Sequence, residues 1–428
     1  MNILKFYRLK YTVLEILGYI YISPIIFFKK MIFVLKDRYV CTRNINNRCS
    51  KTFSYVEQNI DLNKKTIVVI DNYIPEYDIH AGARTLFQYM QLYKNLGLDV
   101  VFIPDDYIKR EPYTTELKDI GIQVLYGRWY KKNIEKWLLK NSKFISFVML
   151  NRPRSIKYID FFKKYINATI IYYGMDMYFI REYQRYLIEH KKEALRAYKY
   201  YKKIECKMYK DADVIFTVSL KEQEKIKKMF TNVNVIQIPC FFYKIFSRVK
   251  YNYSERENIM FVGGQKHPPN PDAVSWFCLK IFPKILEKNN SIKFYVVGNY
   301  SIDFINKYNN SSVIFTGKIS DKELKNIYSS IRLSIIPLRY GAGVKGKTIE
   351  AMYYGLPIIS TDYGIEGLKE VDNFIEIVKD EKEFSDSVLK LYNNKEKLEA
   401  MSKKSFDYIR LNFSYDTALN IVKKALQQ

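Results

Sequence analysis

Short apolar segments alternate with longer amphipathic segments along most of the chain. The apolar segments are rich in valine and isoleucine, and their lengths are typical of strands buried on both faces of a sheet. Between them, residues 83–96 and 156–165 have apolar side chains at helical spacing. This alternation predicts parallel sheets covered by helices on both faces. The predicted strands are residues 66–71, 99–104, 123–126, 144–150, 168–173, 213–218, 259–262, 292–297, 313–315, 333–337 and 357–360.

The alternation is interrupted between residues 238 and 258, where Pro239, several aromatic residues and a charged run replace it. A chain of 428 residues also exceeds what one hydrophobic core usually organises, so two domains are expected. We therefore predict two α/β domains joined by a hinge. The predicted divisions are an N-terminal extension at 1–63, a first domain at 64–240, a hinge at 241–257, a second domain at 258–380 and C-terminal helices at 381–428.

Local signals predict several helix boundaries. A helix in the second domain should end or kink at Pro283. Residues 179–210 have helical periodicity throughout and are predicted to form one long helical segment. Two residue pairs match the capping box that starts a helix, Ser219 with Glu222 and Ser320 with Glu323.

The segment 333–360 contains the strongest candidate for a ligand site. A predicted strand is followed by a loop rich in glycine, which can turn tightly or approach a ligand closely. Lys345 and Lys347 add positive charge at the start of a predicted helix, where free amide groups favour anions. Glu350 can accept hydrogen bonds from a sugar hydroxyl. The pattern predicts a site for a nucleotide or nucleotide sugar, and an ion pair between Lys347 and Glu350 with no ligand is the alternative. The loop glycines are Gly341, Gly343 and Gly346.

Motifs in this half of the chain carry a resemblance to a known family. Residues 339–360 are RYGAGVKGKTIEAMYYGLPIIS, and they follow FVGG at 261–264, HPPN at 267–270 and DAV at 272–274. In this order the motifs resemble the donor site of retaining GT-B glycosyltransferases of family 4, in the branch that carries FVGG, HPPN and DAV. The resemblance implies an α/β chain with the GT-B fold, in which two Rossmann-like, doubly wound domains face a cleft.

The resemblance also implies roles for residues of the second domain. The glycines after the FVGG strand would let a diphosphate approach, and the lysines would neutralise it as the glycosidic bond breaks. Glu350 would hold the ribose, and Lys347 is the catalytic candidate of this domain. Many relatives carry another acid at the position of Ala342, so this chain would hold the donor sugar differently. The donor-binding candidates are Gly263, Gly264, Arg339, Gly343, Lys345, Lys347 and Glu350.

The first domain contains two further candidate segments. The loop with His80, Gly82 and Arg84 resembles the loop by which relatives approach the donor phosphate or the acceptor, and a solvent-exposed turn is the alternative. A later segment retains Asp176 where relatives have an Asp followed by a His, and Tyr178 replaces that His. Asp176 is therefore the catalytic candidate that orients the acceptor hydroxyl or takes its proton. A helix N-cap is its alternative role.

Charge and hydropathy indicate a membrane surface as a partner. The formal net charge is +25, from 70 Lys and Arg against 45 Asp and Glu, which favours an anionic partner. The charge is spread along the chain and no nucleic-acid-binding motif accompanies it, so an anionic membrane is preferred to nucleic acid. Residues 11–28 are mostly apolar, but Glu15 and Pro24 interrupt them and basic residues flank them. They fit a segment lying in a membrane interface, and a helix packed on the first domain is the alternative.

The catalysed reaction is predicted to need no bound metal. The 5 cysteines lack metal-binding spacing and are expected to be reduced thiols in a reducing compartment. The sequence suggests no Asp-x-Asp pair on a loop for Mg²⁺ coordination. No cofactor is expected beyond a nucleotide-diphosphate sugar, which is a co-substrate.

These features predict a retaining glycosyltransferase of the hexosyltransferase type. It would move a sugar from a nucleotide-diphosphate sugar to a hydroxyl of a glycan or lipid-linked glycan. We expect a role in bacterial surface polysaccharide, either lipopolysaccharide or capsule, and a cytoplasmic location at the inner face of the membrane. The alternatives are another GT-B enzyme, such as a nucleotide-sugar epimerase, and a non-catalytic sugar-nucleotide-binding protein.

Overall fold

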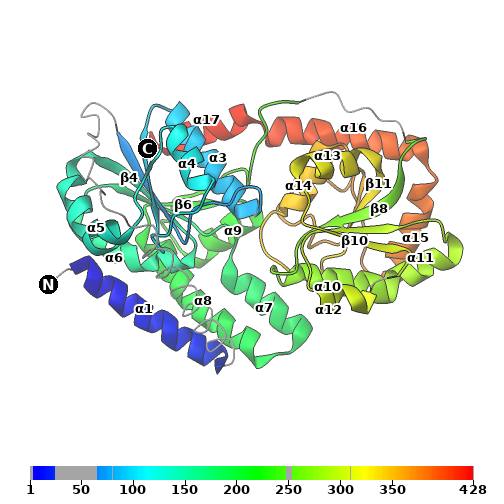
Figure 1. Ribbon diagram of the computed structural model, residues 1–428, viewed down its shortest axis with the longest axis horizontal. Coiled ribbons are helices and arrows are strands. Elements are labelled where there is room, and N and C mark those ends of the chain that lie inside the picture. Colours follow the sequence, from blue (N-terminus) through cyan, green and yellow to red (C-terminus); the bar gives the residue numbers. More distant parts are fainter. Residues whose placement is uncertain (1–2, 25–64, 80, 247–252, 309, 428) are drawn as a thin grey trace.

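The computed structural model describes residues 3–24, 65–79, 81–246, 253–308 and 310–427. Two lobes lie side by side, and each is built on a parallel sheet flanked by helices (Figure 1). The N-terminal lobe also carries a helix, α1 (Ile3–Ile22), that precedes its sheet.

In the described part of the N-terminal lobe, seven parallel strands form one sheet in the order β3-β2-β1-β4-β5-β6-β7. Both faces of the central strand β1 (Thr66–Asp71) are buried, because alternate residues belong to two different apolar clusters. The strand order reverses between β1 and β4 (Ile145–Asn151), where ligands bind in sheets of this kind. The other strands are β2 (Asp99–Pro104), β3 (Gln123–Val124), β5 (Thr169–Tyr173), β6 (Val214–Thr217) and β7 (Val235–Gln237). The helices include α3 (Ala81–Asn95), α4 (Tyr113–Asp119), α5 (Arg128–Lys140), α6 (Ile156–Tyr165) and α9 (Leu220–Met229), with short 3₁₀ turns at Ser142–Phe144 and Pro153–Ser155.

The C-terminal lobe repeats this topology. Among its described residues, six parallel strands have the order β10-β9-β8-β11-β12-β13, which reverses between β8 (Glu257–Val262) and β11 (Ile331–Ile336). The predicted fold class, α/β with two doubly wound domains, is confirmed. The other strands are β9 (Phe294–Val297), β10 (Val313–Gly317), β12 (Ile358–Ser360) and β13 (Glu376–Ile377). The helices are α10 (Pro269–Trp276), α11 (Phe282–Lys288), α12 (Ile302–Tyr308), α13 (Asp321–Ser330), α14 (Gly346–Tyr353), α15 (Glu381–Tyr392), α16 (Lys395–Asn412) and α17 (Tyr415–Ala425).

Local signals in the sequence predict some helix ends correctly and miss others. Ser320 and Glu323 form the predicted capping box of α13. Ser219 is the N-cap residue of α9, so the predicted helix start is confirmed, but its side chain makes no capping bond and the predicted capping box is wrong. Glu222 instead accepts a hydrogen bond from the backbone N–H of Met177, at 3.1 Å. The predicted break at Pro283 is confirmed, because a π-helical turn, Phe277–Ile281, separates α10 from α11 just before it.

The predicted helix over residues 179–210 is two helices. α7 (Tyr178–Glu189) and α8 (Lys192–Asp211) pack against each other as a hairpin (Figure 1). The chain turns at His190, whose φ of 53° is left-handed. No glycine or proline marks this turn, so hydrophobic periodicity alone could not locate it.

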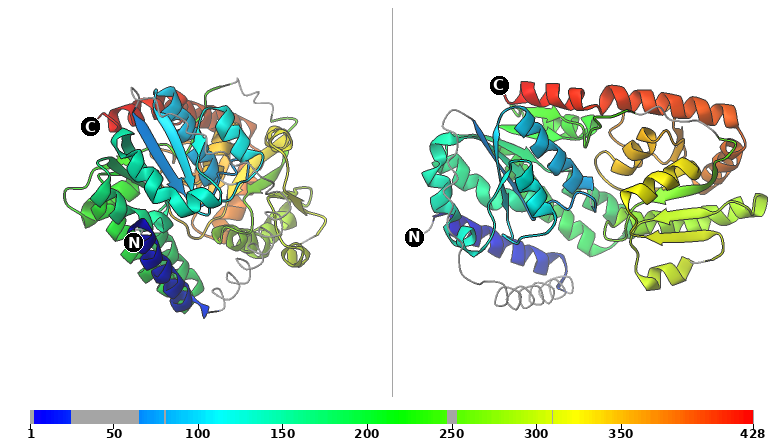
Figure 2. Two further views of the ribbon diagram at one scale, coloured as in Figure 1. Left: turned by 60° about the vertical axis from the view of Figure 1, so that its left-hand side comes forward. Right: turned by 45° about the horizontal axis from the view of Figure 1, so that its top comes forward.

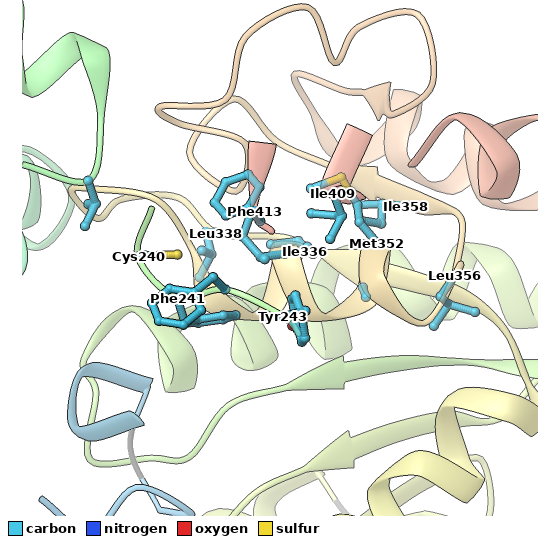
Figure 3. Packing of buried hydrophobic residues seen from close by; sticks show 14 of the residues in the cluster. Cys240, Phe241, Tyr243, Ile336, Leu338, Met352, Leu356, Ile358, Ile409 and Phe413 are labelled. Carbon is cyan, nitrogen blue, oxygen red and sulfur yellow. The ribbon is translucent and has the colours of Figure 1, made fainter. Parts of the chain in front are cut away.

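The two lobes share a continuous apolar junction. Phe241 and Tyr243, in the segment that joins them, lie beside Ile336 and Leu338 of the second lobe and Phe413 near the C-terminus (Figure 3). The C-terminal helices α16 and α17 run along one side of both lobes, and α17 returns to the first lobe (Figures 1 and 2). Its Tyr415 accepts a hydrogen bond from Asn95 of α3 at 2.8 Å.

Helix α1 packs on the first lobe. Leu4, Tyr11 and Ile22 are buried there, and the Tyr11 hydroxyl donates to Asp160 of α6 at 2.7 Å. Packing on the first domain was the alternative interpretation of residues 11–28, of which 25–28 lie outside the described residues. Within the described part of the chain, no helix is both long enough and apolar enough to cross a bilayer.

Candidate functional site

The segments that follow β8 and β11 meet where the strand order of the second sheet reverses. Gly263 and Gly264 follow β8, and the basic loop follows β11 and leads into α14. Lys347 Nζ donates to Asn270 Oδ1 at 2.6 Å, and Asn270 Nδ2 donates to the Gly264 carbonyl at 2.8 Å. A Cβ atom at Gly263 would lie 2.7 Å from Lys347 Nζ, so glycine is needed there. The structure thus brings the FVGG, HPPN and basic-loop motifs together.

The two loop lysines carry more positive charge than the protein around them neutralises. Burial lowers the pKa of both, and the positive charge of Lys345 lowers the pKa of Lys347 further. Lys345 has a carboxylate partner, Glu366, at 3.4 Å. Lys347 forms no ion pair within the residues that the structure describes, and its ammonium lies 4.0 Å from the centre of the Phe261 ring. A bound anion would stabilise the charged form of both lysines.

The electrostatic environment around the start of α14 is positive. The helix begins at Gly346, so its first amide groups and the positive end of its dipole lie beside the two lysines. The imidazole of His267 reaches the surface, yet the protein atoms around it, and then the charges of Arg181, Lys347 and Lys345, lower its pKa to about 3. His267 is therefore neutral at physiological pH and adds no charge of its own. This environment favours a ligand with more than one negative charge.

The first turns of α3 and α14 face each other across the two domains. A Cβ atom at Gly346 would lie 3.3 Å from Cβ of Ala81. Arg84 Nη1 donates to Glu350 Oε1 at 3.0 Å, which forms an ion pair between the domains. The alternative pair of Lys347 with Glu350 is therefore wrong. Two predicted site residues, one from each domain, are instead in direct contact.

Gly82, a loop candidate of the first domain, lies at the reversal point of the sheet of that domain. A Cβ atom at Gly82 would lie 3.2 Å from Nη2 of Arg152, which follows β4. Arg152 Nε donates to Asp71 Oδ1 at 2.9 Å, at the end of β1. Arg152 was not predicted as a site residue. A basic residue after a strand is common, and only the strand order shows that Arg152 lies at the reversal point. His80 lies outside the described residues.

Asp176 lies against the basic loop. A Cβ atom at Gly343, whose φ of 73° requires glycine, would lie 3.3 Å from Cβ of Asp176. Arg181 Nη1 donates to Asp176 Oδ2 at 2.5 Å, whereas Oδ1 is buried and has no hydrogen-bond partner within the described residues. Met177 is the N-cap residue of α7, so the alternative role of Asp176 as N-cap is wrong. Burial raises the pKa of the Tyr178 hydroxyl, which therefore stays protonated and cannot replace the missing histidine as a base.

Two carboxyl groups near this loop were not predicted from the sequence. Glu222 is buried, and its Oε1 would lie 3.5 Å from a Cβ atom at Gly343. Burial, and then the charges of Asp176 and Glu366, raise the pKa of Glu222 to about 8. Glu366 follows β12 and pairs with Lys345. Glu222 was not recognised as a site residue, because its spacing from Ser219 matched a capping box. No pattern in the sequence indicated Glu366.

Two other features lie outside this cluster. Arg339, a donor-binding candidate, forms a two-bond ion pair with Asp272 of α10, in which Nε and Oδ2 are 2.9 Å apart.

The chain does contain one Asp-x-Asp pair, at the end of α8. Asp211 pairs with Lys163 and Lys207, and Asp213 accepts a hydrogen bond from the N–H of Ile170 at 2.7 Å. Both aspartates therefore support the first domain, and the described residues contain no cluster of metal-binding side chains.

Two comparisons with known proteins match part of the chain. Residues 256–394 match the family described as Glycosyl transferases group 1. A protein described as an uncharacterized 44.6 kDa protein in the cps region of Klebsiella pneumoniae is 27% identical over 164 residues, which cover 36% of this chain and 42% of that protein. The match thus spans less than half of the relative's length.

Solved structures resemble the chain over most of its length. Sucrose-phosphate synthase from Thermosynechococcus elongatus has a TM-score of 0.66 at 14% identity, with 85% of this chain and 99% of that chain covered. TarM has a TM-score of 0.67 at 11% identity, with 86% of this chain and 100% of that chain covered. TarM of S. aureus has also been solved with Fondaparinux, alpha-GlcNAc-glycerol and UDP.

At these identities the structural likeness establishes the fold, and the family match identifies the domain that holds the loop lysines. Together they support a glycosyltransferase. Residues 256–394, which hold the loop lysines, match the family described as Glycosyl transferases group 1, and the whole chain has the two-domain GT-B fold of its structural neighbours.

Proposed function

We propose that the chain is a retaining glycosyltransferase of the hexosyltransferase type, which transfers a sugar from a nucleotide-diphosphate sugar to a hydroxyl group. The observation that carries this proposal is the pair of lysines at the start of α14, of which Lys345 is buried and Lys347 is half-buried, and whose charge is only partly balanced by Glu366. A diphosphate matches this site in charge. Gly263, which follows β8, matches it in shape, because the absence of a side chain there leaves room beside Lys347.

The proposed catalytic role of the site is to stabilise the leaving group. As the bond between the anomeric carbon and the diphosphate oxygen breaks, negative charge grows on the diphosphate. Lys345, Lys347 and the first amide groups of α14 would balance that charge without having to move. This arrangement can lower the barrier because its positive charge is already in place before the bond breaks.

Glu350 would hold the ribose hydroxyls once the donor is bound. Its carboxylate is paired with Arg84 in this structure, so donor binding would exchange that ion pair for hydrogen bonds to the ribose. Arg84 would then turn to the diphosphate, which is the partner that its loop was predicted to approach. The donor thereby links the two domains through the same two residues.

The acceptor hydroxyl would attack the anomeric carbon on the face from which the diphosphate leaves, which gives retention. Its oxygen forms the new bond, and its proton passes to the departing diphosphate. Asp176 would orient this hydroxyl through Oδ1, the carboxylate oxygen that makes no hydrogen bond within the described residues. Glu222, which is neutral below about pH 8, can donate a hydrogen bond to a donor-sugar hydroxyl near Gly343. It would supply the carboxyl group that is absent at Ala342.

The biological setting is proposed from the relatives. The Klebsiella pneumoniae protein is described by its place in a cps region, and TarM binds UDP together with a GlcNAc-bearing molecule. We place this chain in the synthesis of a bacterial surface polysaccharide, capsule or lipopolysaccharide. Its acceptor would be a glycan or a lipid-linked glycan at the cytoplasmic face of the membrane.

A donor panel tests the proposal. The purified chain would be incubated with nucleotide sugars that differ in base and in sugar, with and without glycan acceptors, and the products would be separated by chromatography. Release of nucleoside diphosphate with a new glycoside of unchanged anomeric configuration is expected. Lys397→Met is a suitable control for a substitution of Lys347. Lys397 is a lysine of the same lobe, and it is paired with Glu376 on the surface.

Two results would overturn the proposal. Isomerised nucleotide sugar without transfer would identify an epimerase. Saturable binding with no product across the panel would identify a sugar-nucleotide-binding protein.

A further inference from the structure

Helix α1 has two apolar faces, and the first lobe buries only one of them. Leu4, Tyr11, Gly18 and Ile22 form the buried face. The backbone at Gly18 is so close to the Tyr200 ring of α8 that a Cβ atom would lie 2.2 Å from it. Residues seven apart lie on the same side of a helix, which explains why this face holds α1 against the lobe.

The opposite face of α1 is apolar and exposed. A helix turns about 100° per residue, so positions 6, 13 and 20 lie almost opposite positions 4, 11 and 18. Ordinary surface helices carry polar residues on that side. The six apolar side chains there are each between 41% and 62% exposed, and they are Phe6, Leu9, Val13, Ile16, Leu17 and Ile20. We call these six residues the outer face of α1.

The helices beside α1 are strongly basic. α1 packs against α5, α6 and α8, which gather at the same side of the first lobe (Figures 1 and 2). Helix α5 has five basic residues and one acid, Glu135, which is buried. The exposed basic residues of these helices include Lys131, Lys132, Lys136, Lys163, Lys164, Lys192, Lys199, Lys202 and Lys203.

We propose that the outer face of α1 docks on an anionic lipid bilayer, with the helix lying in the plane of the interface. An exposed apolar stripe together with exposed lysines on the neighbouring helices is a combination that binds such a surface, because apolar side chains enter the acyl region while lysines contact the headgroups. A protein partner with an apolar groove would not account for the lysines on three neighbouring helices. None of the helices in the described ranges, α1 included, is long and apolar enough to cross a bilayer.

This docking would place the candidate site close to the membrane. Helix α8 carries α1 on one side and forms the hairpin with α7, whose Gln184 accepts a hydrogen bond from the N–H of Gly341 at 3.0 Å. The same helix places Glu189 near the hydroxyl of Tyr340 in the basic loop. If the proposed function holds, a lipid-linked acceptor would reach the site from this side. The docking itself does not depend on that function.

Vesicle binding tests the docking directly. The full chain would be sedimented with vesicles of phosphatidylcholine alone and of phosphatidylcholine with phosphatidylglycerol. We expect binding to the anionic vesicles, with a partition coefficient that falls about tenfold for each of Leu9→Glu and Leu17→Glu, because burial of one leucine is worth about a factor of ten. Lys131→Glu with Lys132→Glu should also weaken binding to the anionic vesicles. Leu411→Glu, at an exposed leucine of α16 in the other lobe, is the matched control and should bind like the unaltered chain.

The contradicting results are distinct from those of the donor panel. Failure of the unaltered chain to bind anionic vesicles would overturn the docking, and would indicate that another part of the chain covers the outer face. A change in oligomeric state on Leu9→Glu, measured by light scattering, would instead identify a second copy of the chain as the occupant. Equal vesicle binding by Leu17→Glu and Leu411→Glu would also overturn the proposed docking of α1 on the bilayer. Thermal unfolding of each variant would confirm that it is folded.

Discussion

The two domains share one topology but differ in what lies at the point where the strand order reverses. In the first domain, Asp71 and Arg152 follow the two central strands and pair with each other at 2.9 Å. In the second domain, Gly263 and the loop with Lys347 follow the equivalent strands, and Lys347 contacts an amide oxygen instead of a carboxylate. One position is neutralised by the protein itself, and the other carries excess positive charge.

This difference separates a structural role from a binding role. A buried ion pair satisfies both partners, so the first domain has no electrostatic reason to bind an anion there. A half-buried lysine without a carboxylate, such as Lys347, destabilises the protein until an anion arrives, which is the arrangement expected of a ligand site. Strand order alone therefore does not identify the site, and the charge balance at each reversal point does.

The largest expected effect concerns the first domain. Arg152→Met should lower the free energy of unfolding by about 3–5 kcal/mol, because it leaves the buried Asp71 carboxylate without its partner. Urea denaturation would measure the loss. The double variant Asp71→Asn with Arg152→Met should recover part of it, and an unchanged midpoint for Arg152→Met would show that the pair has no structural role.

The matching change in the second domain should affect activity instead. Lys347→Met should reduce kcat for sugar transfer by about 10²–10³-fold, the usual cost of removing one group that stabilises developing charge. The free energy of unfolding of this variant should stay the same or rise, because a partly desolvated charge without a carboxylate partner has been removed. Initial rates and urea denaturation on the same sample separate the two effects. A destabilised variant would place Lys347 with Arg152 as a structural residue.

Glu222 should make stability depend on pH. Its folded-state pKa of about 8 lies above its unfolded value of 4.5, so the folded protein retains a proton that the unfolded chain loses. The contribution of Glu222 to stability should therefore be greatest below pH 4.5. It should fall as the pH rises from 4.5 to about 8, by up to about 5 kcal/mol in total. Unfolding midpoints of Glu222→Gln and the unaltered chain across this range would measure it. Parallel pH profiles for the two proteins would contradict the assignment.

The smallest expected effect concerns the ion pair between the domains. Arg84 is partly exposed, so Arg84→Gln should lower the free energy of unfolding by at most about 1 kcal/mol. It should weaken donor binding more clearly than it weakens stability, because Arg84 is proposed to contact the diphosphate. Calorimetric titration with nucleoside diphosphates would measure the donor affinity, and urea denaturation would measure the stability. Unchanged donor affinity would remove Arg84 from the site.

Much of the fold could be predicted because apolar periodicity reports burial on both faces of a sheet. β1 and β2 begin and end at the predicted residues, and α6 does as well. The short strands β7 and β13 were missed, because three and two residues carry too little pattern. The turn at His190 was missed because both helices continue the same periodicity.

The candidate site could be predicted only where one stretch of sequence carries it. The loop with Lys345 and Lys347 could be found, since glycines, lysines and a helix start occur together. The contact of Arg84 with Glu350 joins residues of different domains, so no local pattern predicts it. Glu222 was assigned to a helix cap because its spacing from Ser219 fits one, and only tertiary structure directs it inward.

Binding of a nucleoside diphosphate tests the central claim most directly. Thermal unfolding of the unaltered chain, Lys347→Met and Lys397→Met would be followed with increasing UDP, GDP or ADP, with the matching nucleoside as a reference. We expect one of the diphosphates to raise the Tm of the unaltered chain and of Lys397→Met, and to leave Lys347→Met unchanged. An equal rise for Lys347→Met would show that the diphosphate binds elsewhere and would contradict the account.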